Sequence, residues 1–170
     1  MNQATMKKSP AAQLETPRFE YGKPLLIAGL RKRFTAETMK NIPELWQRFV
    51  PYIGNVPGQV GQVAYGLWFN APDVDDMDCL VGVEVSSSSS LPGEFSVAAI
   101  PAQKYAVFQH REHVSRLRET LDAIDGWLPG SGLEAPRENA EAPNFFERYS
   151  EEFDPRSGMG GMEVWVPIKS

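Results

Sequence analysis

The segment FFERY at residues 145–149 holds the residue whose type and surroundings point most directly to chemistry. Side chains alternate between the faces of a strand, so Phe145, Glu147 and Tyr149 share one face, opposite the two residues between them. A carboxylate flanked by aromatic rings has two interpretations. It is either a half-exposed glutamate of an edge strand, paired with a Lys or Arg, or the floor of an aromatic pocket. In a pocket it must be protonated, hydrogen-bonded to tyrosine hydroxyls or neutralised by a cation, which aromatic walls also attract.

An aromatic-rich segment at residues 63–70 offers walls for such a pocket. Tyr65 and Trp68 lie on opposite faces of this predicted strand, so at most one of them faces Glu147 unless a bulge intervenes. Glu84 and Glu163 occupy similar places in later predicted strands. Each is either a second carboxylate of the pocket or part of a solvated strand face.

Standard catalytic and metal-binding motifs are missing from the sequence. It contains no phosphate-binding glycine loop of the required spacing, no G-x-S-x-G and no H-E-x-x-H. Cys79 is the single cysteine, and His110 and His113 are the only histidines, which leaves too few ligands for a zinc site. We interpret Cys79 as a small buried hydrophobe and the histidines as solvent-facing or capping residues, with a catalytic base as the alternative. We expect no metal and no cofactor.

Length and charge narrow the functional classes. A chain of 170 residues suits one domain or two fused repeats, and it buries roughly two thirds of its unfolded surface without help from disulfides. The 17 Lys and Arg against 22 Asp and Glu give a net charge of −5, which argues against a nucleic-acid binder. No apolar run is long enough for a membrane span, and residues 1–16 lack the apolar core of a secretory signal. We therefore expect a cytoplasmic protein.

The same order of elements is predicted twice along the chain. After a flexible tail at residues 1–18, a β-α-β-β unit at residues 19–88 is followed by a serine-rich linker and a second unit at residues 94–170. The predicted strands cover residues 23–34, 63–70, 78–86, 95–101, 104–111, 144–153 and 162–169, and the predicted helices cover 38–53 and 113–128. This duplication predicts an α+β fold, an antiparallel sheet carrying two helices. The seam between two related halves is a common place for a ligand.

Several segments, taken in order and spacing, resemble the GyrI-like (AraC-type) effector-binding domain. This domain is the ligand-binding module of drug-sensing transcription regulators and also occurs as a stand-alone protein. The second half carries most of the resemblance, through IPAQKYAVF at 100–108, WLPGSG at 127–132, FERY at 146–149 with FDP at 153–155, and EVWVPI at 163–168. The first half is similar more loosely, through YGLW at 65–68 and VGVEV at 81–85.

The resemblance implies two β-α-β-β units around a pseudo-twofold axis, with a ligand pocket at their seam. In drug-sensing members a buried glutamate of the corresponding strand meets the positive charge of lipophilic cations. The matching residue is Glu147, with Tyr149 as a companion. The aromatic residues of the pocket wall are not fixed by the motif, and the candidates are Tyr65, Trp68, Tyr105, Phe145 and Trp165.

One departure from the regulators concerns DNA binding, because residues 1–18 are too few for a DNA-binding domain. We therefore expect a stand-alone protein that binds lipophilic cationic or aromatic compounds and does not contact nucleic acid directly. One alternative is a protein-interaction module that regulates a partner such as DNA gyrase or a transcription regulator. A second alternative is a hydrolase of reactive small molecules, so enzyme activity stays open.

Overall fold

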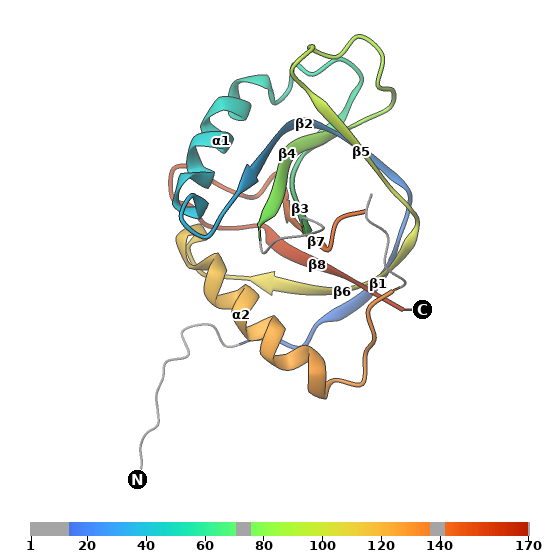
Figure 1. The fold of residues 1–170 in the computed structure, drawn as a ribbon, viewed down its shortest axis with the longest axis vertical. Coiled ribbons are helices and arrows are strands. Elements are labelled where there is room, and N and C mark those ends of the chain that lie inside the picture. Colours follow the sequence, from blue (N-terminus) through green and yellow to red (C-terminus); the bar gives the residue numbers. More distant parts are fainter. Residues whose placement is uncertain (1–13, 71–75, 137–141, 170) are drawn as a thin grey trace.

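The computed structural model describes residues 14–70, 76–136 and 142–169, which form one antiparallel sheet and two helices (Figure 1). The strands lie in the order β1-β6-β8-β7-β3-β4-β2-β5. Their bounds are β1 Arg18–Gly22, β2 Leu25–Phe34, β3 Gln59–Asn70, β4 Met77–Val85, β5 Ser96–Ile100, β6 Gln103–His110, β7 Phe145–Tyr149 and β8 Met162–Ile168. The helices are α1 Ile42–Phe49 and α2 Leu117–Trp127, flanked by the 3-10 turns η2 Met39–Asn41, η3 Val50–Tyr52, η4 Val114–Arg116 and η5 Leu128–Gly130.

The two halves of the chain occupy the two halves of the sheet. From the centre outward the order is β3-β4-β2 in the first half and β7-β8-β6 in the second, so corresponding strands occupy corresponding places. The halves meet where β3 pairs with β7, and there Gly66 lies opposite Glu147. This arrangement confirms the predicted α+β fold of two β-α-β-β units related by a pseudo-twofold axis.

A further short strand precedes each unit and crosses to the other half of the sheet. β1 precedes the first unit but pairs with β6 of the second. β5 precedes the second unit but pairs with β2 of the first. The sequence pattern predicted β5 but not β1, because the RFEYG segment is short and mostly exposed. β1 forms because β6 offers it an unpaired row of backbone groups. Residues 1–13 of the predicted tail lie outside the described residues, whereas Leu14 packs against the core under α2.

Two short linkers force the sheet to curl. Lys23 and Pro24 join β1 to β2, the first and seventh strands in the order, and Pro101 and Ala102 join β5 to β6, the eighth and second. A connection of this length spans at most about 11 Å, whereas six strand spacings in a flat sheet amount to about 29 Å. The outer strands must therefore approach each other, and Figure 1 shows the resulting curved sheet.

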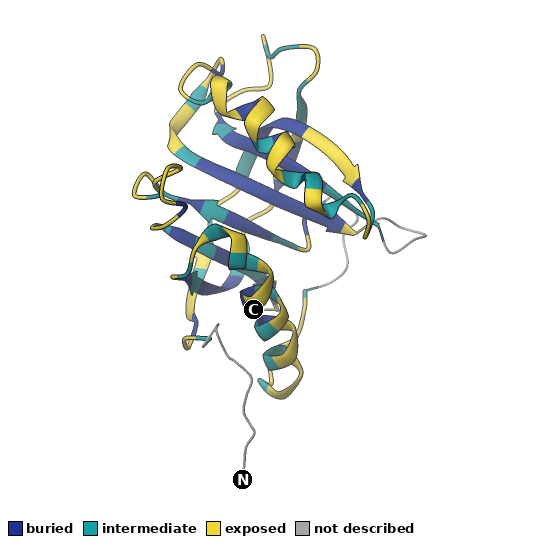
Figure 2. Cartoon of the chain, turned by 90° about the vertical axis from the view of Figure 1, so that its left-hand side faces the viewer, coloured by how far each residue is buried: buried dark blue, intermediate teal, exposed yellow. Residues whose placement is uncertain are grey.

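Both helices cover one face of this sheet, as Figure 2 shows with their buried sides turned inward. Leu45 and Phe49 of α1 pack on β2 and β4, and Ile124 of α2 packs on β6 and β8. Phe145 contacts the core under each helix, so it marks the middle of this face. The predicted helix at 38–53 is confirmed as α1 between two 3-10 turns, with Pro43 in its first turn. The opposite face carries a separate apolar core that includes Leu67, Leu80 and Ile100.

Candidate functional site

The carboxylate of Glu147 lies at the centre of the helix-covered face, where β7 pairs with β3. The Trp68 indole Nε1–H donates a hydrogen bond of 2.7 Å to its Oε2, and the Tyr149 hydroxyl donates one of 2.7 Å to its Oε1. Trp68 reaches this position because β3 turns even-numbered side chains toward the helices, and Tyr149 because it is two residues along the same strand. Each carboxylate oxygen therefore has one neutral donor.

The space for this carboxylate comes from Gly66, which lies directly opposite Glu147 in the β3–β7 pairing. A Cβ atom at Gly66 would lie 3.0 Å from Glu147 Oε1 and 3.3 Å from the Trp46 ring. Both distances are shorter than ordinary van der Waals contacts to carbon, so any larger residue would displace the carboxylate or the ring. Because Gly66 has no side chain, it leaves the space that the Glu147 carboxylate occupies.

Aromatic rings surround the carboxylate. The Trp46 ring of α1 packs edge-on against Tyr149 with centroids 5.1 Å apart, and the Phe153 ring also packs edge-on against Tyr149, at 5.0 Å. Phe145 stacks with Trp68 at 6.3 Å. The sequence pattern missed Trp46 and Phe153, because it placed Trp46 on the apolar side of a helix and Phe153 in the last part of a strand. The structure ends β7 at Tyr149, and the turn that follows folds Phe153 back onto it.

Burial sets the electrostatics of this site. It raises the pKa of Glu147, and the hydrogen bonds from Tyr149 and Trp68 oppose that rise only in part. Burial, together with the neighbouring Glu147 charge, also holds the pKa of Tyr149 well above its usual value. Among the residues that the structure describes, no Lys, Arg or His forms an ion pair with Glu147. The arrangement can therefore accept a positive charge from outside.

The site is closed in this structure. Glu147, Trp68 and Tyr149 are 4%, 5% and 8% exposed. A bulky ligand can reach the carboxylate only when a covering side chain moves. Trp46 is the candidate for that movement, because it is only partly buried and lies on the short helix α1.

The sheet separates the predicted site residues into two groups. Glu147, Tyr149, Trp68 and Phe145 lie on the helix-covered face, whereas Tyr65, Tyr105 and Trp165 belong to the core of the opposite face. This split follows from strand alternation, which predicted opposite sides for Tyr65 and Trp68. The structure therefore brings four of the seven candidates together and places three elsewhere.

The two other glutamates also lie away from Glu147. Glu163 accepts hydrogen bonds from Arg18, Gln109 and Trp165, and Glu84 pairs with Lys23 at 3.3 Å. Neither is a second carboxylate of the Glu147 site. Both fit the alternative interpretation, partly solvated positions on a strand face.

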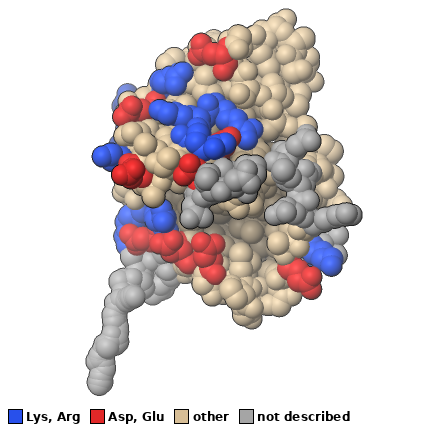
Figure 3. All heavy atoms as spheres, in the orientation of Figure 1, with Lys and Arg blue, Asp and Glu red and all other residues tan. Residues whose placement is uncertain are grey.

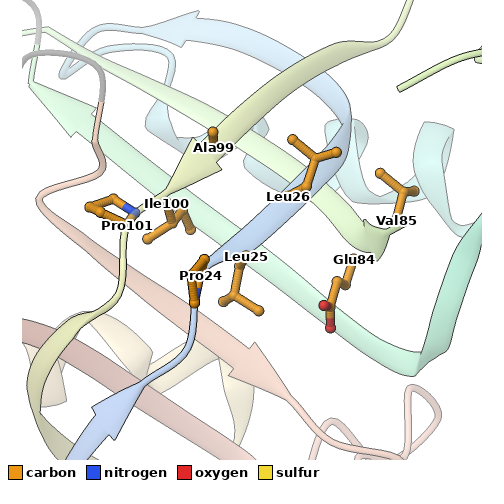
Figure 4. Close-up of a pocket in the computed structure, with 8 residues that line it drawn as sticks. All are labelled: Pro24, Leu25, Leu26, Glu84, Val85, Ala99, Ile100 and Pro101. Atoms are coloured by element: carbon orange, nitrogen blue, oxygen red, sulfur yellow. The ribbon is translucent and has the colours of Figure 1, made fainter. Parts of the chain in front are cut away.

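A groove of about 610 Å³ lies at the ends of β2, β4 and β5 (Figure 4). Its walls include Leu25, Leu26 and Ile100, and its one ionisable lining residue is Glu84. None of the seven predicted site residues lines it. An open groove without aromatic walls lacks the features expected of the predicted pocket, so its size alone does not make it the site.

The remaining reactive side chains have structural roles. Cys79 is buried, and burial raises the pKa of its thiol, as expected for a small hydrophobe. The solvent-facing or capping interpretation is wrong for His110, which is buried with its ring nitrogens bonded to the Thr120 hydroxyl and to the His113 carbonyl. His113 caps the turn η4 by accepting a hydrogen bond from the Ser115 amide. Within the described ranges, no three His, Cys, Asp or Glu side chains gather as metal ligands would.

The charged surface shows no extended basic face in the view of Figure 3. Acidic and basic side chains are intermixed there, and the largest basic group is bordered by acidic residues. The ion pairs of the described residues include those of Arg31 and Arg33, which both pair with Asp78. No helix in the described part of the chain is long and apolar enough to cross a bilayer.

Comparison with known proteins places this geometry in a family. The model of the GyrI-like small molecule binding domain matches residues 15–169. The transcriptional regulator BrlR of Pseudomonas aeruginosa is 30% identical over 129 residues, which cover 75% of this chain and 46% of BrlR. The chain thus spans about half the length of this curated relative.

Two solved structures share the fold. SAV2435 bound to tetraphenylphosphonium superposes with a TM-score of 0.73 at 19% identity, covering 92% of this chain and 95% of that one. The EcmrR C-terminal domain superposes with a TM-score of 0.60 at 15% identity, covering 94% of this chain and 99% of that one. The match across residues 15–169 shows that the chain belongs to the family of GyrI-like small molecule binding domains.

Proposed function

We propose that this domain binds lipophilic cations and that Glu147 supplies the opposing charge. The observation that carries the proposal is a fully buried carboxylate among aromatic rings, without an ion-pair partner in the described part of the chain. An unpaired buried charge is costly, and a cation that enters the site removes this cost. The rings of Trp46, Trp68 and Tyr149 add cation–π attraction.

The hydrogen bonds of Glu147 suggest which cations suit the site. Each carboxylate oxygen already accepts one hydrogen bond, but the negative charge has no positive charge to balance it among the described residues. A primary ammonium would bring three N–H groups that each need an acceptor, whereas an arylphosphonium brings charge and apolar area without donors. We therefore expect delocalised or fully substituted cations to bind more tightly than primary amines of similar apolar area.

Two relatives support this assignment. SAV2435, which shares the fold, has been solved with tetraphenylphosphonium, and BrlR, which shares sequence, is a transcriptional regulator. By analogy, ligand capture is the primary event in this chain, with the cytoplasm as its expected compartment.

Titration calorimetry of the full chain with tetraphenylphosphonium tests the proposal. Replacing Glu147 with Gln keeps the shape and removes the charge, and we expect affinity to fall by about 10- to 150-fold, the equivalent of roughly 1.5–3 kcal/mol. Tetraphenylborate, which has the same shape and the opposite charge, should not bind. Unchanged affinity in Glu147→Gln, or equal binding of tetraphenylborate, contradicts the proposal.

Glu163→Gln is the matched control, because Glu163 also accepts a tryptophan N–H but lies on the other face. Its affinity for tetraphenylphosphonium should equal that of the wild type. Melting curves of the three proteins show whether each variant is folded.

A further inference from the structure

A second cavity lies on the face of the sheet that the helices do not cover. Its volume is about 140 Å³, and both halves of the chain contribute to its walls. Gly22 and Leu25 border it where the linker between β1 and β2 crosses the curved sheet. The other lining residues are Lys23, Tyr65, Tyr105, Phe146, Arg148 and Trp165.

Four aromatic rings form one continuous cluster around this cavity. Phe146 lies at its centre, edge-on to Tyr65 at 5.6 Å and to Tyr105 at 5.4 Å, and stacked on Trp165 at 5.6 Å. Tyr105 also packs edge-on against Trp165 at 5.1 Å. An apolar cavity of about 150 Å³ is large enough to bind benzene, so this cavity has room for one six-membered ring.

Two hydrogen-bond donors at the cavity have no carboxylate or carbonyl acceptor among the described residues, and they contact each other: the Arg148 guanidinium donates a hydrogen bond to the Tyr65 hydroxyl oxygen. Tyr65 is only 5% exposed, and its hydroxyl proton has no acceptor among the described residues. Arg148 lies beside it, and its positive charge partly offsets the rise that burial causes in the pKa of Tyr65. Across the described ranges, no carboxylate or carbonyl accepts a hydrogen bond from the Arg148 guanidinium.

The nearest carboxylate to Arg148 is Glu163, whose Oε1 lies 3.9 Å away, beyond hydrogen-bond distance. Glu163 is already bound by Arg18 at 2.8 Å, Gln109 at 2.7 Å and Trp165 at 2.9 Å. At the rim, Lys23 is matched by Glu84 at 3.3 Å. Among the described residues, Arg148 is therefore the lining cation that has no carboxylate within hydrogen-bond distance, and its guanidinium keeps further N–H donors beyond the one that bonds Tyr65.

We propose that this cavity is a second binding site, for a small aromatic carboxylate. The ring enters the cluster formed by Tyr105, Phe146 and Trp165. The carboxylate accepts hydrogen bonds from the Arg148 guanidinium, whose planar fork suits two carboxylate oxygens, and from the Tyr65 hydroxyl. This site has the opposite charge preference to the Glu147 site and lies across the sheet from it.

Benzoate is the probe, with benzamide as its neutral analogue and benzylamine as its cationic one. In the ¹⁵N-labelled full chain the four tryptophans give separate indole N–H signals, which Trp→Phe variants assign. We expect benzoate to shift the Trp165 signal and leave Trp46, Trp68 and Trp127 in place. Benzamide and benzylamine should bind at least tenfold more weakly, because neither offers a charged acceptor to Arg148.

Arg148→Gln should weaken benzoate binding by roughly tenfold or more, and Tyr65→Phe by roughly two- to tenfold. Arg118→Gln is the control, because Arg118 is an exposed arginine of α2 that pairs with Asp122 and does not line the cavity. Benzoate binding that Arg148→Gln leaves unchanged, equal binding of benzamide, or a benzoate shift confined to Trp68 each overturns the proposal. So does the absence of any shift at millimolar benzoate.

The two proposals fail separately. Glu147→Gln should abolish the effect of tetraphenylphosphonium on the Trp68 signal and leave the benzoate titration unchanged. Arg148→Gln should do the reverse. A loss of both responses in either variant, with the fold intact by melting, contradicts the assignment of two independent sites.

Discussion

Two tryptophan–glutamate pairs lie on neighbouring strands of this domain, and the pKa values of their two glutamates shift in opposite directions. Trp68 donates to Glu147 at 2.7 Å on the helix-covered face, and Trp165 donates to Glu163 at 2.9 Å on the other face. What differs is the cation. Arg18 lies 2.8 Å from Glu163, whereas no described cation pairs with Glu147.

The pKa values of the two carboxyl groups reflect this difference. Burial tends to raise the pKa of both. At Glu163 the hydrogen bonds from Arg18, Trp165 and Gln109 outweigh burial, and the pKa is lowered. At Glu147 burial outweighs the bonds from Tyr149 and Trp68, and the pKa is raised. Whether the fold itself provides a counter-charge thus decides whether the pKa of a buried carboxyl group is lowered or raised.

The largest expected effect comes from filling the space beside Glu147. Gly66→Ala places a methyl group 3.0 Å from Glu147 Oε1, so the carboxylate or Trp46 must shift. We expect a loss of about 1–3 kcal/mol in the free energy of unfolding and at least a roughly tenfold loss in tetraphenylphosphonium affinity. Denaturant unfolding and calorimetry measure the two effects. Gly93→Ala, where nothing lies within 4 Å of the added atom, should leave both unchanged.

A smaller effect, with opposite signs at the two glutamates, is expected in the pH dependence of stability. Because the folded-state pKa of Glu147 is raised, its favourable contribution is complete below the unfolded-state pKa and is lost as pH rises through the folded value. Glu147→Gln should therefore match the wild type in acid and melt higher at neutral pH without ligand. Each kcal/mol relieved raises Tm by roughly 2–4 °C in a chain of this size.

Glu163 should show the reverse dependence. Its folded-state pKa is lowered, so its contribution is present above the unfolded-state pKa and is lost as pH falls through the folded value. Melting curves between pH 3 and pH 8, compared with Glu163→Gln, should thus separate at neutral pH with the wild type more stable, and converge in acid. Curves that diverge in the same direction for both variants would show that the two glutamates do not differ as described.

The smallest effect concerns the neutral-pH stability of Glu163→Gln itself. Its partner Arg18 is 43% exposed at the side chain, so the ion pair is screened and its loss should cost about 0.2–1 kcal/mol. The same change removes the carboxylate 3.9 Å from Arg148 and should strengthen benzoate binding by roughly two- to fivefold. Weaker benzoate binding would mean that Glu163 holds Arg148 in place rather than competing with the ligand.

Much of the central site could be predicted from the sequence because strand alternation is a local rule. It correctly put Phe145, Glu147 and Tyr149 on one face and separated Tyr65 from Trp68. Neither alternation nor the family motif could say that Tyr105 and Trp165 lie with Tyr65 across the sheet from Glu147. That outcome depends on how strands far apart in the chain are paired.

The sequence by itself determined the two helices and the aromatic surroundings of Glu147 on its strand, because hydrophobic periodicity and strand alternation are local patterns. It also determined the duplication, because the same order of predicted elements occurs twice. Only the tertiary structure decided that β1 completes the far half, that Gly66 makes room for Glu147 and that Trp46 covers it. It also decided that Arg18 neutralises Glu163, 145 residues away, while Glu147 has no described cation. Charge compensation is a matter of distances in space, and these are fixed by long-range strand pairing rather than by local pattern.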